Sequence, residues 1–502
     1  MTLHLFTLPA LRSLDRHPYL NSLKWPIILV LASAVFYVSR IVYRIFLHPL
    51  SRFPGPRQAA ISSSWLKKAS KGGNVEGVIA QLHRHHKSAA IRIAPNELHI
   101  DDVDYYKVIY NQTAPFPKNK DFYDGFQTPH TVFAETDPAL HKIRRKKLNP
   151  FFSKSAVNSL QGLIEEKLGN LTKRLNAFAD GHTCNLSNAF RCLTADVISE
   201  YAFGSCLNLT LESDDQFYSG FLKAFDTLTR GLWDFIYSPL LRKISANTPR
   251  RLAEMSTALQ PIFGLVAYAE ASLSSLKKFS GRKTGAIFES LEGISHQEAV
   301  AEAMDFFAAG TDTTAYTLCV AVTELTKQPV IADKLSIELG STVDGEDLPA
   351  LTRLEQLPYL TACVKESLRF ALATPGRLPR IVPPGVALVI NGIAVPAGTV
   401  VGMSATTMHH NTRLWGDDAK VFRPERWLAD EMLDQNMVAF SKGQRNCIGQ
   451  NLAMAEITLV LARLFKDYRF EFAEGTALPP GPDKFVVDVG HPGLLMLVKR
   501  RA

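Results

Sequence analysis

The stretch from Phe440 to Gly449, Phe-Ser-Lys-Gly-Gln-Arg-Asn-Cys-Ile-Gly, restricts the fold of this chain more than any other segment. It places Cys447 between two glycines, beside Arg445 and shortly before a run with helical periodicity. A thiolate needs a metal or positive charge to stay deprotonated. Gly443 and Gly449 suit a backbone that turns tightly and comes close to a flat ligand. The pattern predicts a loop that presents a cysteine sulfur to a bound group. The alternative is a small buried hydrophobe, which most free cysteines are.

The same stretch resembles the haem-binding loop of the cytochrome P-450 family, and Ala453 fits that pattern too. The resemblance implies that Cys447 is the axial ligand of haem iron, a ligand that favours O–O cleavage. It also implies that Arg445 meets a haem propionate and that Phe440 shields the thiolate. It covers about residues 45–500 and implies the α+β, mainly α fold of this family. That fold has a long central helix over haem b (iron protoporphyrin IX) and small β-sheets.

The longest predicted helix runs from about His296 to Lys327 and begins with a capping box of Ser295 and Glu298. Residues 309–314, Ala-Gly-Thr-Asp-Thr-Thr, are weak helix formers in its interior. Such a local failure of propensity is typical of functional sites, although a tolerated kink with a solvated aspartate explains the residues equally well.

This segment resembles the oxygen-binding groove of the same family. The resemblance implies that Ala309 and Gly310 border the haem and dioxygen, with Gly310 leaving space for a ligand. It implies that Asp312 and Thr313 are the acid–alcohol pair that relays protons.

Three further residues form a predicted structural cluster. Glu366 and Arg369 lie one helical turn apart, a spacing that on most helices makes a weak surface pair. They resemble the Glu-x-x-Arg pair of the family, and Arg426, in Phe-Arg-Pro-Glu-Arg-Trp, resembles its partner. Bidentate contacts between guanidinium and carboxylate groups make such a cluster rigid, so we expect it to brace the core on the haem side.

The remaining cofactor-binding residues are basic. His141 and Arg145 share one helical face, in a run that is otherwise typical of a solvated surface. The resemblance implies that they hold a haem propionate, with His141 at a position that is commonly Trp in the family. It implies the same for Arg380, with Arg377 as a substitute.

An apolar substrate pocket is predicted above the long helix. Phe116, Phe122 and Phe126 precede the helix of His141, and Met304 and Phe307 precede Gly310. We expect Met304 and Phe307 to line the pocket together, with no charged group on its face above Asp312. For each residue alone, an ordinary place in the core is at least as good an explanation.

The N-terminal segment predicts a membrane anchor. Residues 25–43 form an apolar run close to the ~20 residues of a spanning helix. The Lys and Arg residues flanking it slightly favour a cytosolic body. A cleaved signal peptide and a buried core helix are the alternatives. The predicted organisation is a tail over 1–24, an anchor over 25–43, a Pro/Gly hinge over 44–60 and one catalytic domain over 61–502.

The composition of the chain argues against several other classes of function. The chain has 502 residues, 46% of them hydrophobic, with a net charge of +8 from dispersed basic residues. This argues against nucleic-acid binding, which needs a concentrated basic face. Its six cysteines show no zinc or disulfide spacing. Hairpins are predicted at Ala90–Ile100 and Phe485–Val498, with strands near Val386–Ile390 and Thr399–Met403.

The resemblance implies a monooxygenase of the endoplasmic reticulum membrane. The chain looks like the fungal microsomal members of the family that oxidise terpenoids and related secondary metabolites. No flavin or nicotinamide domain is present in the sequence, so NADPH acts through a separate cytochrome P-450 reductase, with cytochrome b5 as a further expected partner. A haem-thiolate isomerase or dehydratase is one alternative, and a non-catalytic haem sensor or electron carrier is another.

Overall fold

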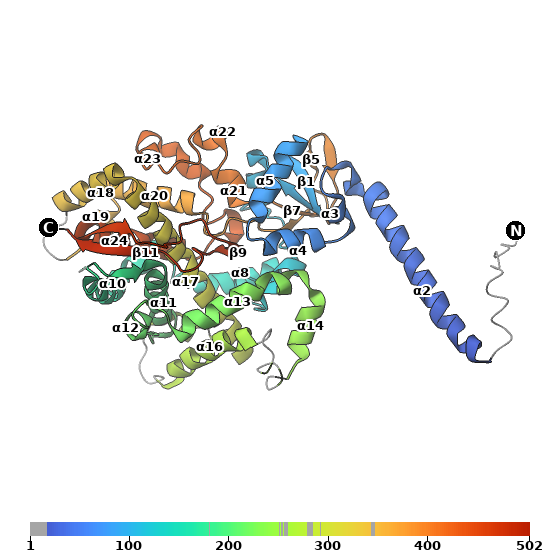
Figure 1. Cartoon of the computed structure of the whole chain (residues 1–502), viewed down its shortest axis with the longest axis horizontal. Coiled ribbons are helices and arrows are strands. Elements are labelled where there is room, and N and C mark those ends of the chain that lie inside the picture. The colour runs from blue at the N-terminus through green and yellow to red at the C-terminus, as the bar shows by residue number, and fades with distance from the viewer. Residues whose placement is uncertain are drawn as a thin grey trace.

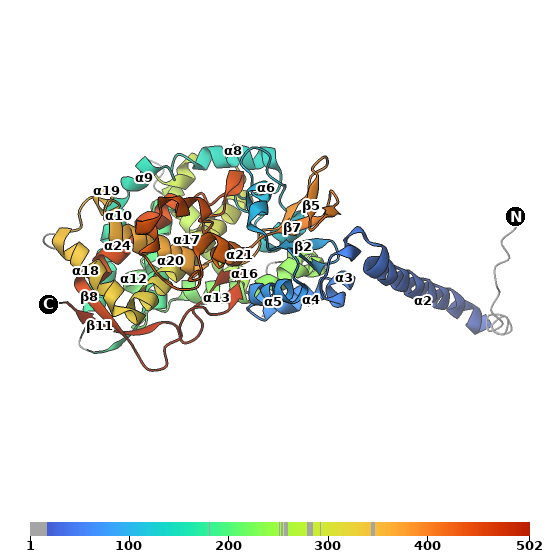
Figure 2. The same ribbon diagram turned by 90° about the horizontal axis from the view of Figure 1, so that it is seen from above.

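The computed structural model describes residues 18–501, apart from 180, 250, 251, 253, 254, 256–259, 279–284, 292 and 343–346. A helical body surrounds the long helix α17, His296–Lys327, and small sheets lie at two ends of it, one group toward the N-terminal helix and another sheet beside the C-terminus (Figures 1 and 2). The predicted α+β, mainly α class is confirmed.

The N-terminal half of the chain holds the helices α2 Pro18–Val42, α3 Arg57–Ile61, α4 Ser64–Lys71, α5 Val75–His86, α6 Tyr106–Ile109, α7 Lys120–Tyr123, α8 Pro138–Leu148, α9 Lys154–Asn158, α10 Gln161–Asn176, α11 Leu186–Phe203, α12 Leu209–Glu212, α13 Gly220–Tyr237 and α14 Pro239–Asn247. The C-terminal half holds α16 Gln260–Lys278, α17, α18 Pro329–Thr342, α19 Leu351–Leu354, α20 Pro358–Ala371, α21 Ala405–His409, α22 Thr412–Trp415, α23 Arg426–Ala429 and α24 Gln450–Asp467.

The strands are short and fall into separate sheets. They are β1 Ala90–Ala94, β2 Glu97–Ile100, β3 Thr183–Asn185, β4 Arg380–Ile381, β5 Leu388–Ile390, β6 Ile393–Val395, β7 Val400–Gly402, β8 Tyr468–Phe472, β9 Asp483–Lys484, β10 Val486–Val487 and β11 Leu495–Arg500. The sheet orders are β1-β2-β7-β4, β3-β11-β8, β5-β6 and β9-β10. The predicted hairpin of β1 and β2 is confirmed, with Ala90 opposite Ile100.

Helix α17 begins and ends where the sequence predicts. Its N-cap Ser295 accepts a hydrogen bond from the backbone of Glu298, whose side chain accepts one from the backbone N–H of Ser295. The central part of α17 packs along α11 and is buried through Leu325. This buried packing holds the helix through residues that favour it weakly, because tertiary contacts outweigh local propensity.

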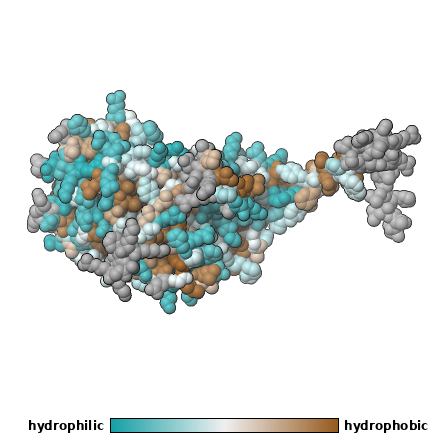
Figure 3. Space-filling model, turned by 90° about the horizontal axis from the view of Figure 1, so that it is seen from below, coloured by the Kyte–Doolittle hydropathy of each residue, from teal (hydrophilic) through white to brown (hydrophobic). Residues whose placement is uncertain are grey.

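The N-terminal helix α2 stands outside the body (Figures 1 and 3). Residues Trp25–Leu47 are long and apolar enough to cross a membrane, with a mean hydropathy of 1.9 and no burial. The helix already begins at Pro18, within the expected tail, and continues into a π-helical turn, Tyr43–Leu47. The segment expected as a hinge packs on β1, where the N–H of Arg92 donates to the carbonyl of Pro54 at 2.8 Å.

The predicted hairpin at Phe485–Val498 is wrong. Val486 and Val487 pair with β9, whereas β11 pairs with β3 and β8. The turn leads the chain away from β10, because Gly493 packs so closely on β3 that a Cβ there would lie 2.7 Å from Asn185 Oδ1. The carbonyl of Leu494 then accepts from the N–H of Leu186, next to β3.

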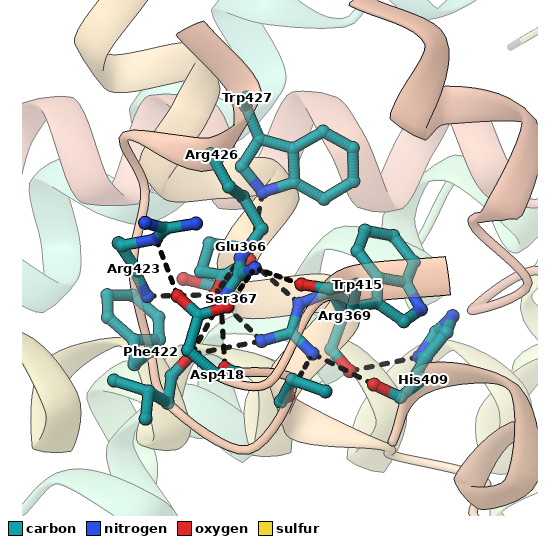
Figure 4. A network of polar contacts seen from close by, with 12 residues as sticks. Glu366, Ser367, Arg369, His409, Trp415, Asp418, Phe422, Arg423, Arg426 and Trp427 are labelled. Atoms are coloured by element: carbon teal, nitrogen blue, oxygen red, sulfur yellow. Dashed lines mark hydrogen bonds and ion pairs between the residues drawn. The ribbon is translucent and has the colours of Figure 1, made fainter. Parts of the chain in front are cut away.

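Glu366, Arg369 and Arg426 form a buried network within the helical body (Figure 4). Arg369 donates to both oxygens of Glu366 at 2.8 Å, and Arg426 Nε donates to Oε1 at 3.1 Å. The indole N–H of Trp427 and the backbone N–H of Arg423 complete the shell of the carboxylate. The structure brings together the three side chains that the sequence groups, on α20 and at the start of α23.

We predict that Glu366→Gln lowers the free energy of unfolding by about 3–5 kcal/mol, because two buried guanidinium groups lose their counter-charge. Urea denaturation followed by tryptophan fluorescence measures this change. Glu471→Gln is the control, since Glu471 forms an exposed pair with Lys499 and its loss should cost at most about 1 kcal/mol. Equal losses in the two variants would contradict a bracing role for Glu366.

Candidate active site

The cysteine loop projects Cys447 into a large internal cavity of about 1050 Å³. The backbone N–H of Cys447 donates to the carbonyl of Phe440 at 2.8 Å, and this bond closes the loop. Gly443 is required because its φ is +76° and a Cβ would lie 2.5 Å from the carbonyl of Asn111. A Cβ at Gly449 would lie 3.9 Å from the sulfur, an ordinary van der Waals contact, so the space there does not require glycine.

Cys447 differs from the other cysteines in its accessibility. Its side chain is exposed to the cavity, whereas the other five cysteines are buried or half-buried. Burial from bulk water raises the pKa of the Cys447 thiol, and the backbone N–H of Gly449 and the charge of Arg145 oppose this rise. An accessible sulfur with two stabilising neighbours can serve as a metal ligand.

Helix α17 forms another part of the cavity wall. Ala309 is exposed there, and Thr313 is half-buried one turn further on. The hydroxyl of Thr313 donates to the carbonyl of Ala309 at 2.8 Å, and that of Thr317 donates to Thr313 at 2.9 Å. Cys447, Ala309 and Thr313 therefore share one cavity.

Gly310 has a packing role in addition to the one expected. A Cβ there would lie 2.7 Å from Cγ1 of Ile198 on α11. The missing side chain thus admits the neighbouring helix, and Gly310 also lines the cavity.

Asp312 is bound to a residue that the sequence analysis missed. Arg191 of α11 donates from Nε to Asp312 Oδ1 at 2.7 Å and from Nη2 to Asp226 of α13 at 2.7 Å. Burial raises the pKa of Asp312, and the charge of Arg191 opposes this. No local sequence signal marks Arg191, because its partners are 121 and 35 residues away.

Basic side chains gather at one edge of the cavity. Lys118, His141, Arg145 and Arg445 line it, and Arg380 is buried behind them. Burial and the charges of neighbouring arginines lower the pKa of Arg445 to about 10 and that of His141 to about 3. Lys118, which the sequence analysis missed, has its pKa lowered by burial and then by Arg380 and Arg445.

These cations have neutral partners. Arg380 donates to the hydroxyl of Tyr123 at 2.7 Å, and Arg145 donates to the side chain of Asn446 at 2.7 Å. Among the described residues, no carboxylate forms an ion pair with Lys118, Arg145, Arg380 or Arg445. Such a cluster fits a ligand with two carboxylates, such as haem. Arg377, the expected substitute, is paired with Glu97 at 2.6 Å and lies outside the cavity lining.

Only two of the five residues predicted for the substrate pocket line the cavity. Phe126 and Met304 line it, but Phe116, Phe122 and Phe307 do not. Phe307 is fully buried and packs on Phe203 and Phe221, with ring centroids 5.2 and 5.3 Å away.

Phe116 and Phe122 are also buried in clusters of their own. The expectation of a pocket face without charge is wrong as well, because Glu302 and Asp305 of α17 line the cavity.

Comparison with known proteins agrees with this geometry. A model of the cytochrome P450 family matches residues 54–497. The chain is 31% identical to cytochrome P450 monooxygenase aneF of Aspergillus aculeatus, over 86% of this chain and 90% of that protein. It is 32% identical to the fusicoccadiene C-8 hydroxylase of Alternaria brassicicola, over 88% of each chain. It is also 32% identical to cytochrome P450 monooxygenase tpcC of Cochliobolus heterostrophus, over 90% of each.

The chain therefore belongs to the cytochrome P450 family. It is an oxidoreductase of the class that incorporates molecular oxygen, and haem is the cofactor that the family implies.

We predict that Gly310→Ala lowers stability by up to about 2 kcal/mol, because overpacking against Ile198 exceeds the gain in helix propensity. Thermal unfolding measures it, and a double-mutant cycle with Ile198→Ala should give a coupling of about 0.5–3 kcal/mol. Gly169→Ala on α10 is the control, since nothing lies within 4 Å of its Cβ position. It should raise stability by about 1 kcal/mol. A zero coupling would show that Gly310 is not needed for the packing of α11.

Proposed function

We propose that the chain is a membrane-anchored haem-thiolate monooxygenase that hydroxylates a lipophilic substrate of terpenoid or related secondary-metabolite type. The observation that carries the proposal is the accessible sulfur of Cys447 in the same cavity as Ala309 and Thr313. The substrate class rests on the large cavity and on the name of one relative, a fusicoccadiene hydroxylase.

In this proposal each residue of the site has a separate role toward the haem. Cys447 would ligate the iron, Phe440 would shield the sulfur, and Ala309 and Gly310 would border the haem. Lys118, His141, Arg145, Arg380 and Arg445 would hold the propionates. When bound, haem with a thiolate ligand supplies the activation of dioxygen. The described residues include no cluster of three or more His, Cys, Asp or Glu side chains that could hold a metal ion, so a single cysteine ligand agrees with the donor set.

Thr313 and Asp312 are the proposed proton-handling residues. The hydroxyl of Thr313 is half-buried at the cavity wall, where it can hold a proton at Oγ1 after leaving the carbonyl of Ala309. Asp312 is the adjacent residue, and Arg191 keeps its carboxylate available as an acceptor. Phe126 and Met304 provide apolar contacts for the substrate.

The proposed redox partners and location are those expected for a family member that is anchored in a membrane by helix α2. Helix α2 would hold the body at the cytosolic face of the endoplasmic reticulum. The substrate would arrive from the lipid phase, and electrons from NADPH would arrive through a separate cytochrome P450 reductase, with cytochrome b5 as an additional donor. Activity of the chain in microsomes with and without added reductase tests this arrangement.

We predict that Cys447→Ala abolishes the long-wavelength absorption band of the reduced carbonyl complex, because that band requires a thiolate ligand. Cys206→Ser, remote from the cavity lining, should keep the band. Difference spectra of the two purified variants make the comparison. A normal band in Cys447→Ala would reject the assignment of the ligand.

We predict that Thr313→Ala uncouples the reaction, so that NADPH is consumed while product falls and hydrogen peroxide rises. Loss of a positioned proton donor costs about 10²-fold or more in product formation. Thr313→Ser keeps a hydroxyl and should retain most of the coupling. The ratio of product to NADPH consumed is the measurement, and an unchanged ratio in Thr313→Ala would remove Thr313 from the proton path.

A further inference from the structure

Asp305 is an acidic residue of the cavity wall that the functions described so far leave unused. It lies on α17 four residues before Ala309 and eight before Thr313, so the three share one helical face. It lines the cavity and is partly exposed there. Its Oδ2 is buried without a hydrogen-bond partner in the described part of the protein.

The surroundings of Asp305 compensate its charge only in part. Burial raises its pKa to about 6, opposed by the hydroxyls of Thr131 and Thr128 and by the charge of Lys118. Lys118 is engaged elsewhere, since it donates to the carbonyl of Phe133 and lies 4.1 Å over the ring of Tyr123. Within residues 18–501, as far as they are described, no basic side chain forms an ion pair with Asp305.

The neighbouring acid, Glu302, has direct partners in the protein, although burial and the charge of Asp305 raise its pKa to about 8. Both of its oxygens lie 3.2 Å from the backbone nitrogen of Val132, and Arg144 lies 3.6 Å from Oε2. Glu302 therefore holds the segment before α8 against α17. Asp305 is one turn nearer to Thr313, and its partners are the hydroxyls of Thr131 and Thr128 and not a charged or backbone group. A carboxylate away from bulk water is costly unless it is paired, so an occupant of the cavity is the natural partner.

We propose that Asp305 is the substrate-recognition residue of this site and that it binds a basic nitrogen on an otherwise lipophilic substrate. The inference rests on the proposed monooxygenase function. Most cations of the cavity are engaged elsewhere. Lys118, Arg145 and Arg445 gather at the edge assigned to the propionates. Arg191 is paired with two acids and Lys484 with Asp488, and Arg230 is exposed to solvent.

The helix also sets a distance for this substrate. Eight residues at a rise of 1.5 Å separate Asp305 from Thr313 by about 12 Å along the axis of α17. A substrate that binds Asp305 through its nitrogen would place carbons several bonds away beside Ala309 and Thr313. Recognition at one end and oxidation near the other suit a rigid polycyclic amine.

The test compares two probes of one shape on the haem-loaded full-length protein. They are N,N-dimethyldehydroabietylamine, a tricyclic tertiary amine, and dehydroabietane, the same ring system without nitrogen. Equilibrium dialysis at neutral pH gives the Kd of each. The amine should bind about ten- to hundred-fold more tightly, as expected for a charged hydrogen bond. Asp305→Asn should remove this preference and change the Kd of dehydroabietane less than about three-fold. Equal binding of the probes, or a preference that survives in Asp305→Asn, would overturn the inference.

Two controls separate this inference from the function on which it rests. Glu302→Gln should keep the preference for the amine, because Glu302 is already bound to Val132 and Arg144. Asp305→Glu should keep it too, and Asp305→Ser replaces the asparagine variant if that variant does not load haem. The long-wavelength carbonyl band is recorded for each protein. Its absence from the wild type would reject the proposed function, whereas a normal band without amine preference rejects only the role of Asp305.

Discussion

Like charges repel one another strongly where little water is present. The basic side chains at the edge of the cavity are held close together in spite of this repulsion. Arg380 and Arg445 lower the pKa of Lys118, and Arg380 lowers that of Arg445. Neutral groups such as Tyr123 and Asn446 hold the arginines in place. A dianionic ligand turns this repulsion into attraction, so the cofactor stabilises the fold as well as the reaction. The cavity, the cysteine loop and the exposed face of α17 surround the space that such a ligand would fill.

The network around Glu366 is the opposite case. Its carboxylate is fully buried, and it accepts from two guanidinium groups, an indole and a backbone N–H. Because the charges of this network are balanced within the protein, its stability needs no ligand. The cations at the cavity edge differ, because a bound anion would be needed to balance them.

Features formed by residues close together in the sequence could be predicted from local patterns. The capping box set the start of α17, alternation gave the β1–β2 hairpin, and the glycine-flanked cysteine gave the loop. Helical spacing also brought Glu366 and Arg369 together.

Contacts between segments that are distant in the sequence could not be predicted, because no local pattern encodes them. Phe307 shares a helical face with Met304, but Phe203 and Phe221 draw it into the core. Arg191 and Lys118 lie in stretches without a motif, and only the fold brings them to Asp312 and to the arginines. The final hairpin failed for the same reason, because β3, more than 300 residues earlier, competes for β11.

The pairing of β11 also bears on how the chain is made. This strand lies between β3 and β8, and β3 precedes it by more than 300 residues. Synthesis proceeds from the N-terminus, so α2 and β3 leave the ribosome well before β11. The sheet therefore closes late, after the helical body between β3 and β8 has been made. A chain without β11 would leave β3 and β8 with unpaired edges.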